Sequence, residues 1–280
     1  MHARGFGPVG VDVPVIGQGT WRMEGDDRKA ASAALERGIE LGMTHIDTAE
    51  LYGSGKVEQI IAPVIAGKRE RIFLVSKVMP SNATRRGTIQ ACERSLKHLG
   101  TSHLDCYLLH WPGNHPLEDT IAAFEQLVLD GKIKSYGVSN FDEQELAQAL
   151  RLTGPGKIAC NQVLYHLQER AIEHAVLPYC EQHGIAVVGY TPFGTRSFPP
   201  HGPGGVLLGE IAQRHAATPR QVALAFLTRR PSLFAIPKAA NAAHTADNAG
   251  AGTLTLDASE LEAIDRAFPL GRKTRGIPML

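Results

Sequence analysis

The stretch THIDTAELYGSGK, residues 44–56, places an acid, a phenol and an amine within ten positions, directly after a short apolar run. Asp47, Tyr52 and Lys56 are side chains that can carry charge or transfer a proton, so general acid or base catalysis is one interpretation of the stretch. The other interpretation is a strand that runs into a polar turn and has no chemical role. The rest of the chain has to distinguish the two.

The spacing Tyr52-x-x-x-Lys56 also matches the tyrosine and lysine pair of short-chain dehydrogenases. That pair works because one helical turn brings both side chains to the same face. Two glycines and a serine lie between the two residues here, and they disfavour a helix. We therefore predict that Lys56 is a solvated lysine at the start of the next helix, and that Tyr52 has another basic partner.

The bulk composition excludes several classes of protein. The 280 residues carry 29 basic and 28 acidic side chains, so no charge bias indicates nucleic acid or a membrane surface as a partner. The N-terminus lacks the apolar run of a signal peptide, and no stretch approaches the roughly 18 apolar residues of a spanning helix, so we expect a cytoplasmic protein. Four cysteines stand far apart without metal-ligand spacing, which predicts reduced core thiols and no metal site.

Short apolar runs typical of buried strands recur at intervals of roughly thirty residues, with helical patterns between them. The runs are residues 15–16, 44–46, 72–75, 104–109, 133–138, 158–160, 185–189 and 233–236. The helical patterns cover residues 28–41, 88–99, 117–129, 144–152, 172–183 and 219–228, and a last helix is expected near 257–267.

Eight strands alternating with helices indicate parallel βαβ units, and the number eight favours a closed barrel over an open sheet. We predict an α/β fold: a single (β/α)8 TIM barrel over residues 1–280, with a short N-terminal β-hairpin and extra helices near the C-terminus. The Gly- and Pro-rich residues 193–205 are interpreted as a mobile loop. A domain linker is the alternative, but neither half of the chain has enough strands to close alone.

The segment GFGPVG, residues 5–10, fits the dinucleotide fingerprint G-x-G-x-x-G. The fingerprint must follow a strand and open a helix, whereas only four residues precede this segment and an extended stretch containing Pro14 follows it. We predict a turn between two short strands that plug the barrel floor.

Polar side chains follow the predicted strands where each strand ends. These positions meet at the C-terminal rim of a (β/α)8 barrel, where active sites lie. Each has a structural explanation by itself, such as an ion pair between Asp47 and Lys77. Together they bring a tyrosine, an ion-paired lysine and a histidine to one mouth, facing amide, hydroxyl and aromatic groups that could hold a flat polar ligand. They are Thr20, Trp21, Asp47, Tyr52, Ser76, Lys77, His110, Trp111, Ser139, Asn140, Asn161, Gln162, Tyr190, Pro237 and Lys238.

Six motifs resemble, in order and across the whole chain, the signatures of the aldo-keto reductases, nearest to short bacterial members that reduce methylglyoxal. They are GMTHIDTAELYG, FLVSKV, LLHWP, YGVSNF, NQVLYH and AIPKA. The resemblance implies NADPH-dependent reduction of small aldehydes and ketones, such as methylglyoxal and aromatic aldehydes, with NADH accepted less well. It assigns catalysis to Asp47, Tyr52, Lys77 and His110.

The resemblance also implies a cofactor site. Ser139, Asn140 and Gln162 would hold the nicotinamide carboxamide, Tyr190 would stack on the ring, residues 191–194 would follow the pyrophosphate, and residues from Lys238 onward would surround the adenosine end. The full cofactor set is Thr20, Trp21, Asp47, Ser139, Asn140, Gln162, Tyr190, Thr191, Pro192, Phe193, Gly194, Ile236, Lys238, Ala239, Ala240, Asn241, His244, Asp247 and Asn248. The substrate set is Trp21, Tyr52, His110 and Trp111.

Two positions depart from the pattern of the family. Many relatives have a serine or threonine after the lysine and an arginine six residues beyond it, whereas this chain has Ala239 and His244. Each change removes a contact to the 2′-phosphate of NADPH, since a neutral imidazole cannot replace the permanent charge of arginine. We therefore expect Lys238 to maintain a preference for NADPH, by a reduced margin that grows as the pH falls.

The proposed chemistry gives each catalytic side chain a task. A developing alkoxide must be protonated, and a free tyrosine with a pKa of about 10 is a sluggish acid. We expect Lys77 to lower the pKa of Tyr52, Asp47 to hold Lys77 charged, and a neutral His110 to orient the carbonyl. Trp21 and Trp111 would wall the pocket.

Two other functions remain open. Lys77 or Lys238 could be the nucleophile of a Schiff-base aldolase, although Asp47 would keep Lys77 charged. The chain could also be a non-catalytic NADP-binding regulatory subunit, although all four catalytic positions are filled. We expect a monomer, and an open pocket without a long C-terminal lid, because only about a dozen residues follow the last predicted helix.

Overall fold

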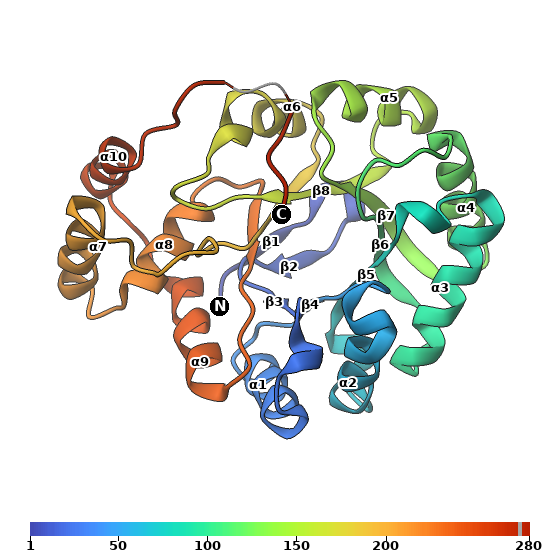
Figure 1. Ribbon diagram of the computed structural model, residues 1–280, viewed down its shortest axis with the longest axis horizontal. Helices are drawn as coiled ribbons and strands as arrows, with labels where there is room; N and C mark the ends of the chain where they lie inside the picture. The colour runs from blue at the N-terminus through green and yellow to red at the C-terminus, as the bar shows by residue number, and fades with distance from the viewer. Residues whose placement is uncertain (274–275) are drawn as a thin grey trace.

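Eight parallel strands form the wall of a barrel, which Figure 1 shows from one end. The computed structural model describes residues 1–273 and 276–280. The strands are hydrogen-bonded in chain order, and bridges from Ile16 to Ala235 and from Gly19 to Lys238 join the first strand to the last. They are β3 (Gln18–Gly19), β4 (His45–Asp47), β5 (Phe73–Val78), β6 (Leu104–Leu109), β7 (Ile133–Ser139), β8 (Ile158–Leu164), β9 (Ala186–Tyr190) and β10 (Leu233–Ile236). The predicted (β/α)8 TIM barrel is confirmed.

Helices cover the outside of the wall and alternate with the strands (Figure 1). Asp142, Thr218 and Asp257 form capping boxes that start three of them, which explains why these helices begin where they do. The helices are α1 (Arg28–Glu40), α2 (Lys56–Ile65), α3 (Arg85–Leu99), α4 (Leu117–Leu129), α5 (Glu143–Thr153), α6 (Val176–Gln182), α7 (Pro203–Arg214), α8 (Pro219–Leu227), α9 (Ala242–Gly250) and α10 (Ala258–Ala267). Short 3-10 turns are η1 (Gly7–Val9), η2 (Met23–Gly25), η3 (Tyr52–Gly55), η4 (Arg69–Arg71), η5 (Pro80–Asn82), η6 (Ala171–His174) and η7 (Ala251–Thr253).

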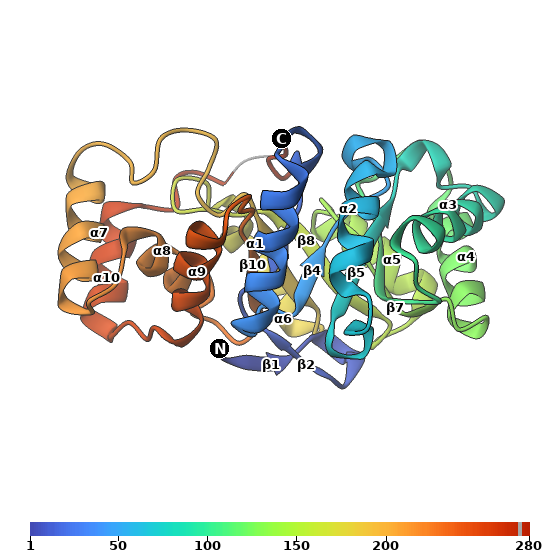
Figure 2. The same cartoon turned by 90° about the horizontal axis from the view of Figure 1, so that it is seen from below.

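The N-terminal hairpin closes the barrel floor, as predicted. β1 (Ala3–Gly5) pairs antiparallel with β2 (Asp12–Pro14), and Figure 2 shows both at the end of the barrel opposite the C-terminus. Phe6 is fully buried in the barrel interior, where its ring contacts Phe73 and Phe234. Gly7 has φ +54°, and a Cβ there would lie 2.2 Å from Ala159 O, so this turn needs its glycine for the backbone and not for a phosphate.

His45 is the unusual side chain of this floor. It is fully buried on β4 between the edges of Phe6 and Phe73, and neither ring nitrogen has a hydrogen-bond partner among the described residues. Burial lowers its pKa to about 4, although the carboxylate of Asp47 opposes the shift. His45 is therefore neutral in the folded protein at neutral pH.

Three segments are organised differently from the sequence prediction. The first strand is β3 and not residues 15–16, because Val15 and Ile16 pack in the core without joining the ladder to β4, whose register begins at Gln18. Gln18 is buried despite its polarity, since its amide donates to Leu35 O and Met43 O. The predicted helix 172–183 is split at Ala175 into η6 and α6, and the predicted loop 193–205 ends in the first turn of α7.

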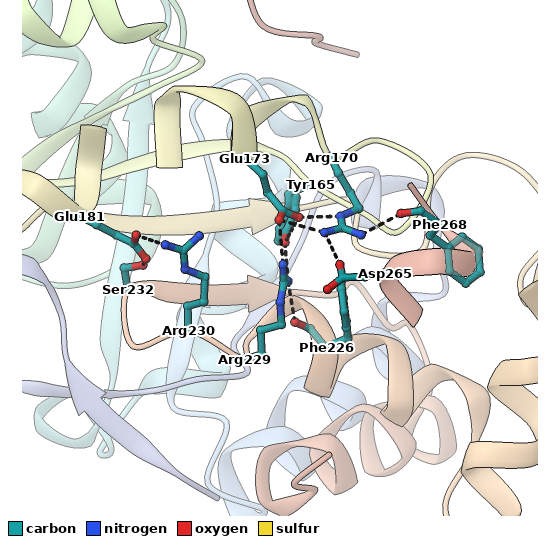
Figure 3. A network of polar contacts seen from close by, with 10 residues as sticks. All are labelled: Tyr165, Arg170, Glu173, Glu181, Phe226, Arg229, Arg230, Ser232, Asp265 and Phe268. Carbon is teal, nitrogen blue, oxygen red and sulfur yellow. Dashed lines mark hydrogen bonds and ion pairs between the residues drawn. The ribbon is translucent and has the colours of Figure 1, made fainter. Parts of the chain in front are cut away.

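A largely buried ionic network ties the connection after β8 to the segment that follows α8 and to α10 (Figure 3). Arg170 and Arg229 both contact the carboxylate of Glu173, which also accepts from the hydroxyl of Tyr165 at 2.7 Å. Arg170 continues to the backbone of Phe268 and to Asp265 beside it. Because every charge has an opposite partner, the network can be buried without leaving an isolated ion.

The cysteines and the helices bear on two further predictions. All four cysteines, Cys92, Cys106, Cys160 and Cys180, are free and buried, as predicted for core thiols. Over residues 1–273 and 276–280, every helix is too short or too polar to cross a membrane.

Candidate active site

An ion pair lies at the base of the mouth. Lys77 near the end of β5 and Asp47 at the end of β4 are both buried, and their Nζ and Oδ1 atoms are 2.6 Å apart. Lys77 also donates to Thr48 O at 2.8 Å. Burial opposes the charge of Lys77, but Asp47 and Tyr52 outweigh it and raise the pKa of the ammonium. Lys77 is therefore a fixed cation, which argues against its use as a Schiff-base nucleophile.

Tyr52 projects from the loop after β4 towards this cation. Its hydroxyl lies 3.4 Å from Lys77 Nζ, while the exposed Lys56 begins α2 as predicted. Burial raises the pKa of Tyr52, and the Lys77 ammonium only opposes that rise. The expectation of a lowered pKa is therefore wrong in its net direction, because the phenol loses more by leaving water than it gains from one ammonium at this distance. The phenol stays protonated at neutral pH, which suits a proton donor.

His110, directly after β6, completes the predicted set of four. Its ring meets that of Tyr52 edge-on, with centroids 5.8 Å apart, and it packs against Trp111 at 4.8 Å. Burial, aided by the charge of Lys77, lowers the pKa of His110 to about 2, so the ring is neutral as expected. We call these four residues, Asp47, Tyr52, Lys77 and His110, the catalytic end of the cleft.

Amide and hydroxyl groups from β7, β8 and β9 face the catalytic end. Gln162 Nε2 donates to Asp47 Oδ2 at 2.7 Å, so the carboxylate that pairs with Lys77 is held on both oxygens. Asn140 donates to His110 O and accepts from the hydroxyl of Tyr190 at 2.9 Å. The sequence predicted that these residues share a rim but not that they are bonded to the catalytic groups, because the two partners are up to 115 positions apart.

A cleft of about 680 Å³ brings most of the predicted site together. The predicted residues that line it are Thr20, Trp21, Asp47, Tyr52, His110, Trp111, Ser139, Asn140, Gln162, Tyr190, Thr191, Pro192, Phe193, Gly194, Ile236 and Lys238. Lining residues that the sequence did not indicate are Gly19, Arg22, Leu51, Thr195, Met279 and Leu280. The last two belong to the tail after α10, which reaches the rim (Figure 1), whereas the expectation of an open pocket without a long C-terminal lid had given the tail no place at the cleft.

Residues 238–248, which we call the outer end, are less enclosed. Lys238 forms an ion pair with Asp26 from the loop after β3. Asn241 caps α9 by accepting from the backbone N–H of His244, whose side chain is exposed. Ala239 and Ala240 precede this cap.

Of two other predicted contacts of the outer end, one has a partner within the protein and one is buried. Asp247 accepts from the hydroxyl of Thr218 at 2.8 Å, and Asn248 is buried on α9. Neither residue lines the cleft, nor do Ala239, Ala240, Asn241 and His244. Apart from Lys238, which lines the cleft, the predicted adenosine contacts therefore lie outside its lining.

The arrangement can protonate an oxygen atom brought to the catalytic end. A protonated phenol, a buried cation beside it and a neutral imidazole meet at one wall of the cleft. Over residues 1–273 and 276–280, histidine, cysteine and carboxylate side chains form no group that could hold a metal ion.

The chain is similar in sequence and in structure to known reductases. The sequence model described as "Aldo/keto reductase family" matches residues 15–268. The chain is 42% identical over 273 residues to methylglyoxal reductase YeaE of Escherichia coli (strain K12), and the aligned region covers 96% of each protein. It is 30% identical over 256 residues to the glyoxal reductase of Bacillus subtilis (strain 168), covering 91% of this chain and 89% of that protein. The crystal structure of an aldo/keto reductase from Klebsiella pneumoniae in complex with NADP and acetate has a TM-score of 0.92 at 40% identity, over all of both chains.

Proposed function

Because the chain belongs to the aldo/keto reductase family, we propose that it reduces small aldehydes and ketones to alcohols with NADPH, using Tyr52 as the proton donor. The observation that carries the proposal is the juxtaposition of the Tyr52 hydroxyl with the buried Lys77–Asp47 ion pair at the wall of the cleft. The Klebsiella pneumoniae relative that binds NADP supports the choice of cofactor.

The cleft fits a nicotinamide dinucleotide in size and in polar groups. Its volume of about 680 Å³ is within the range of small-molecule and cofactor sites. Asn140 and Thr191 on its rim have φ of +61° and +53°, backbone conformations that are uncommon outside glycine and that cluster at binding sites. When bound, NADPH supplies the hydride; Ser139, Asn140 and Gln162 would hold its carboxamide, Tyr190 would stack on the ring, and residues 191–194 and 238–248 would meet the phosphates and adenosine.

The protein's own contribution is a proton and an orientation. Tyr52 donates its hydroxyl proton to the substrate oxygen as that oxygen becomes an alcohol, and the phenolate that remains is stabilised by Lys77 until it takes a proton from solvent. Asp47 and Gln162 hold Lys77 in place. His110, being neutral, donates a hydrogen bond to the carbonyl oxygen and orients it.

The substrates proposed are small reactive carbonyl compounds. Methylglyoxal reductase YeaE and the Bacillus subtilis glyoxal reductase are similar over nearly the whole chain, and their names describe 2-oxoaldehyde reduction. Trp21 and Trp111 line the mouth where such a carbonyl would enter.

Initial rates with NADPH and with NADH over a panel of methylglyoxal, glyoxal, aromatic aldehydes and simple ketones test the proposal. We expect turnover of the aldehydes with NADPH and slower turnover with NADH. The absence of NADPH oxidation with every carbonyl, while NADPH still binds, would favour the regulatory-subunit alternative. Borohydride trapping of a ketone on the enzyme would favour the aldolase.

A further inference from the structure

A buried carboxylate, Glu58, lies behind the catalytic end and takes no part in the reaction proposed above. It is fully buried in the first turn of α2. Its Oε1 accepts from Ser76 Oγ on β5 at 2.8 Å, and its Oε2 lies 3.1 Å from Nδ1 of His98 in the last turn of α3. A carboxylate only accepts, so His98 donates from Nδ1. One side chain thus joins α2, β5 and α3.

The bond to Ser76 fixes the strand next to the buried cation. Ser76 and Lys77 are consecutive on β5, so their side chains point to opposite faces of the barrel wall. Lys77 faces the barrel interior and bonds Asp47, whereas Ser76 faces the helices and bonds Glu58. A shift of Glu58 would therefore be transmitted to Lys77 through a single peptide unit.

The bond to His98 fixes the loop that carries Tyr52. Gly53, Ser54 and Gly55 have φ of +56°, +54° and +86°, three left-handed residues in succession. Such backbone is costly for the non-glycine Ser54 and persists only when its surroundings determine it. The His98 ring lies directly on Gly55, where an added Cβ would come within 2.4 Å of Nδ1. His98 therefore supports the left-handed turn from outside while Glu58 holds His98 in place.

Glu50, at the start of the loop that carries Tyr52, forms a second set of bonds. Glu50 accepts from the backbone N–H of Met79 at 2.8 Å and from Asn82 Nδ2 at 2.9 Å, and it forms an ion pair with Arg94. Two carboxylates thus hold the Tyr52 loop against β5 and α3, one before the tyrosine and one after it. Between the two anchors, the Tyr52 hydroxyl lies 3.4 Å from Lys77 Nζ.

Ser76, His98 and Glu58, which we call the support cluster, have the residue types of a nucleophilic triad but not its geometry. Ser76 Oγ donates to Glu58 and not to His98, and Ser76 is fully buried, so no substrate can reach it. A nucleophile needs its base within hydrogen-bond reach. The cluster is therefore a support and not a second reaction centre.

We infer that Glu58 and His98 are positioning residues that hold the Tyr52 hydroxyl at the distance from Lys77 needed for proton transfer. The inference rests on the proposed role of Tyr52. A displacement of about 1 Å from productive geometry can reduce the rate by roughly a hundredfold, so losing this support is expected to affect turnover more than binding.

The test compares Glu58→Gln with a matched control, Glu260→Gln, in the full-length protein. Glu260 is also buried and is also bonded to a histidine, His215, at 2.9 Å, but it lies on α10 beside α7, across the molecule from α2 and α3 (Figure 1). We measure kcat and KM for methylglyoxal, the Kd for NADPH from its fluorescence, and the melting temperature. Glu58→Gln should lower kcat about tenfold or more with an unchanged Kd, while Glu260→Gln should lower only the melting temperature.

A second pair of variants keeps the inference testable should Glu58→Gln fail to fold. The side chain of His98 is 31% exposed, so it can be changed at less cost to the core. His98→Ala should lower kcat, and His98→Asn should recover much of the loss, because the asparagine amide can donate to Glu58 from the position of Nδ1. Equal kcat values in the two His98 variants would contradict a role through this bond.

Combining Glu58→Gln with Tyr52→Phe separates positioning from general damage. If Glu58 acts through Tyr52, adding Glu58→Gln to Tyr52→Phe should lower the residual kcat by no more than about twofold, because the hydroxyl that Glu58 positions is already absent. A loss that multiplies in the double variant, or a wild-type kcat in Glu58→Gln alone, would overturn the inference and leave the proposed function intact. Full turnover in Tyr52→Phe would instead overturn the proposed function.

Discussion

The two ends of the predicted site, the catalytic end and the outer end, are built in different ways. At the catalytic end, Asp47 and Lys77 are buried and each is held by two or more bonds inside the protein. At the outer end, His244 is exposed and Lys238, itself about a third exposed, is paired with Asp26. Buried and mutually bonded charges cannot be exchanged without leaving an unpaired ion, whereas exposed ones can. The comparison indicates that substitutions cost more at the catalytic end than at the outer end, where we propose that the preference between cofactors is set.

The largest effect is expected from Lys77→Met at the catalytic end. The Lys77 ammonium opposes the burial-driven rise in the pKa of Tyr52, so removing it should raise that pKa further. Reduction of methylglyoxal should fall by about 10²- to 10⁴-fold, the usual range for general acid catalysis. Alcohol oxidation with NADP+, which needs the deprotonated tyrosine, should require a higher pH. Lys56→Met, at the exposed lysine that begins α2, is the control and should leave both rates unchanged.

A second effect concerns the stability of the floor beneath the catalytic end. The pKa of His45 is about 4 when folded and about 6.5 when unfolded, so the unfolded chain takes up the proton first as the pH falls. The free energy of unfolding should therefore drop between pH 6.5 and 4, by up to roughly 3 kcal/mol from this group. His45→Leu should lose less stability over that range in urea unfolding at pH 7.5 and pH 5. An identical loss in the variant and the wild type would rule out this contribution.

At the outer end, Asp26→Asn should strengthen NADPH binding. The substitution releases Lys238 from its ion pair and removes a negative charge near the proposed site of the 2′-phosphate. An exposed ion pair contributes up to about 1 kcal/mol, so the Kd for NADPH should fall by roughly two- to fivefold. The Kd for NADH, which lacks the phosphate, serves as the internal control. Equal tightening of both cofactors would show that Lys238 does not meet the phosphate.

The smallest effect is expected from His244→Arg. Arginine carries a permanent charge in a planar fork that matches a phosphate, whereas the exposed imidazole of His244 offers no such fork. The ratio of kcat/KM for NADPH to that for NADH should therefore rise by roughly a few-fold in the variant. The same ratio in the variant and the wild type would remove position 244 from the proposed phosphate site.

The sequence predicts the strand ends well because apolar runs and the polar residues after them are local features. The runs at residues 104–109 and 233–236 coincide with β6 and β10, and the Asp47–Lys77 ion pair is found as predicted. Short or irregular segments are harder, since the two-residue strand β3 has no apolar run and depends on the buried amide of Gln18.

Features that depend on distant contacts could not be predicted from local patterns. The bond from Gln162 to Asp47 crosses 115 positions, and the tail that brings Met279 and Leu280 to the cleft has no local signal. The pKa of Tyr52 was expected in the wrong direction because the sequence shows its charged neighbours but not the depth of its burial. The hydrogen-bond partners of the site residues, the distances between them and the depth of their burial therefore became known only from the fold.

The central claim is that Tyr52 gives the substrate its proton, and Tyr52→Phe tests it most directly. The change removes one hydroxyl and no proposed cofactor contact. The measurement is kcat for methylglyoxal together with the Kd for NADPH from fluorescence titration of the same sample. We predict a loss of about 10²- to 10⁴-fold in kcat with a Kd close to that of the wild type. Turnover at the wild-type rate in Tyr52→Phe, with NADPH bound normally, would contradict the account.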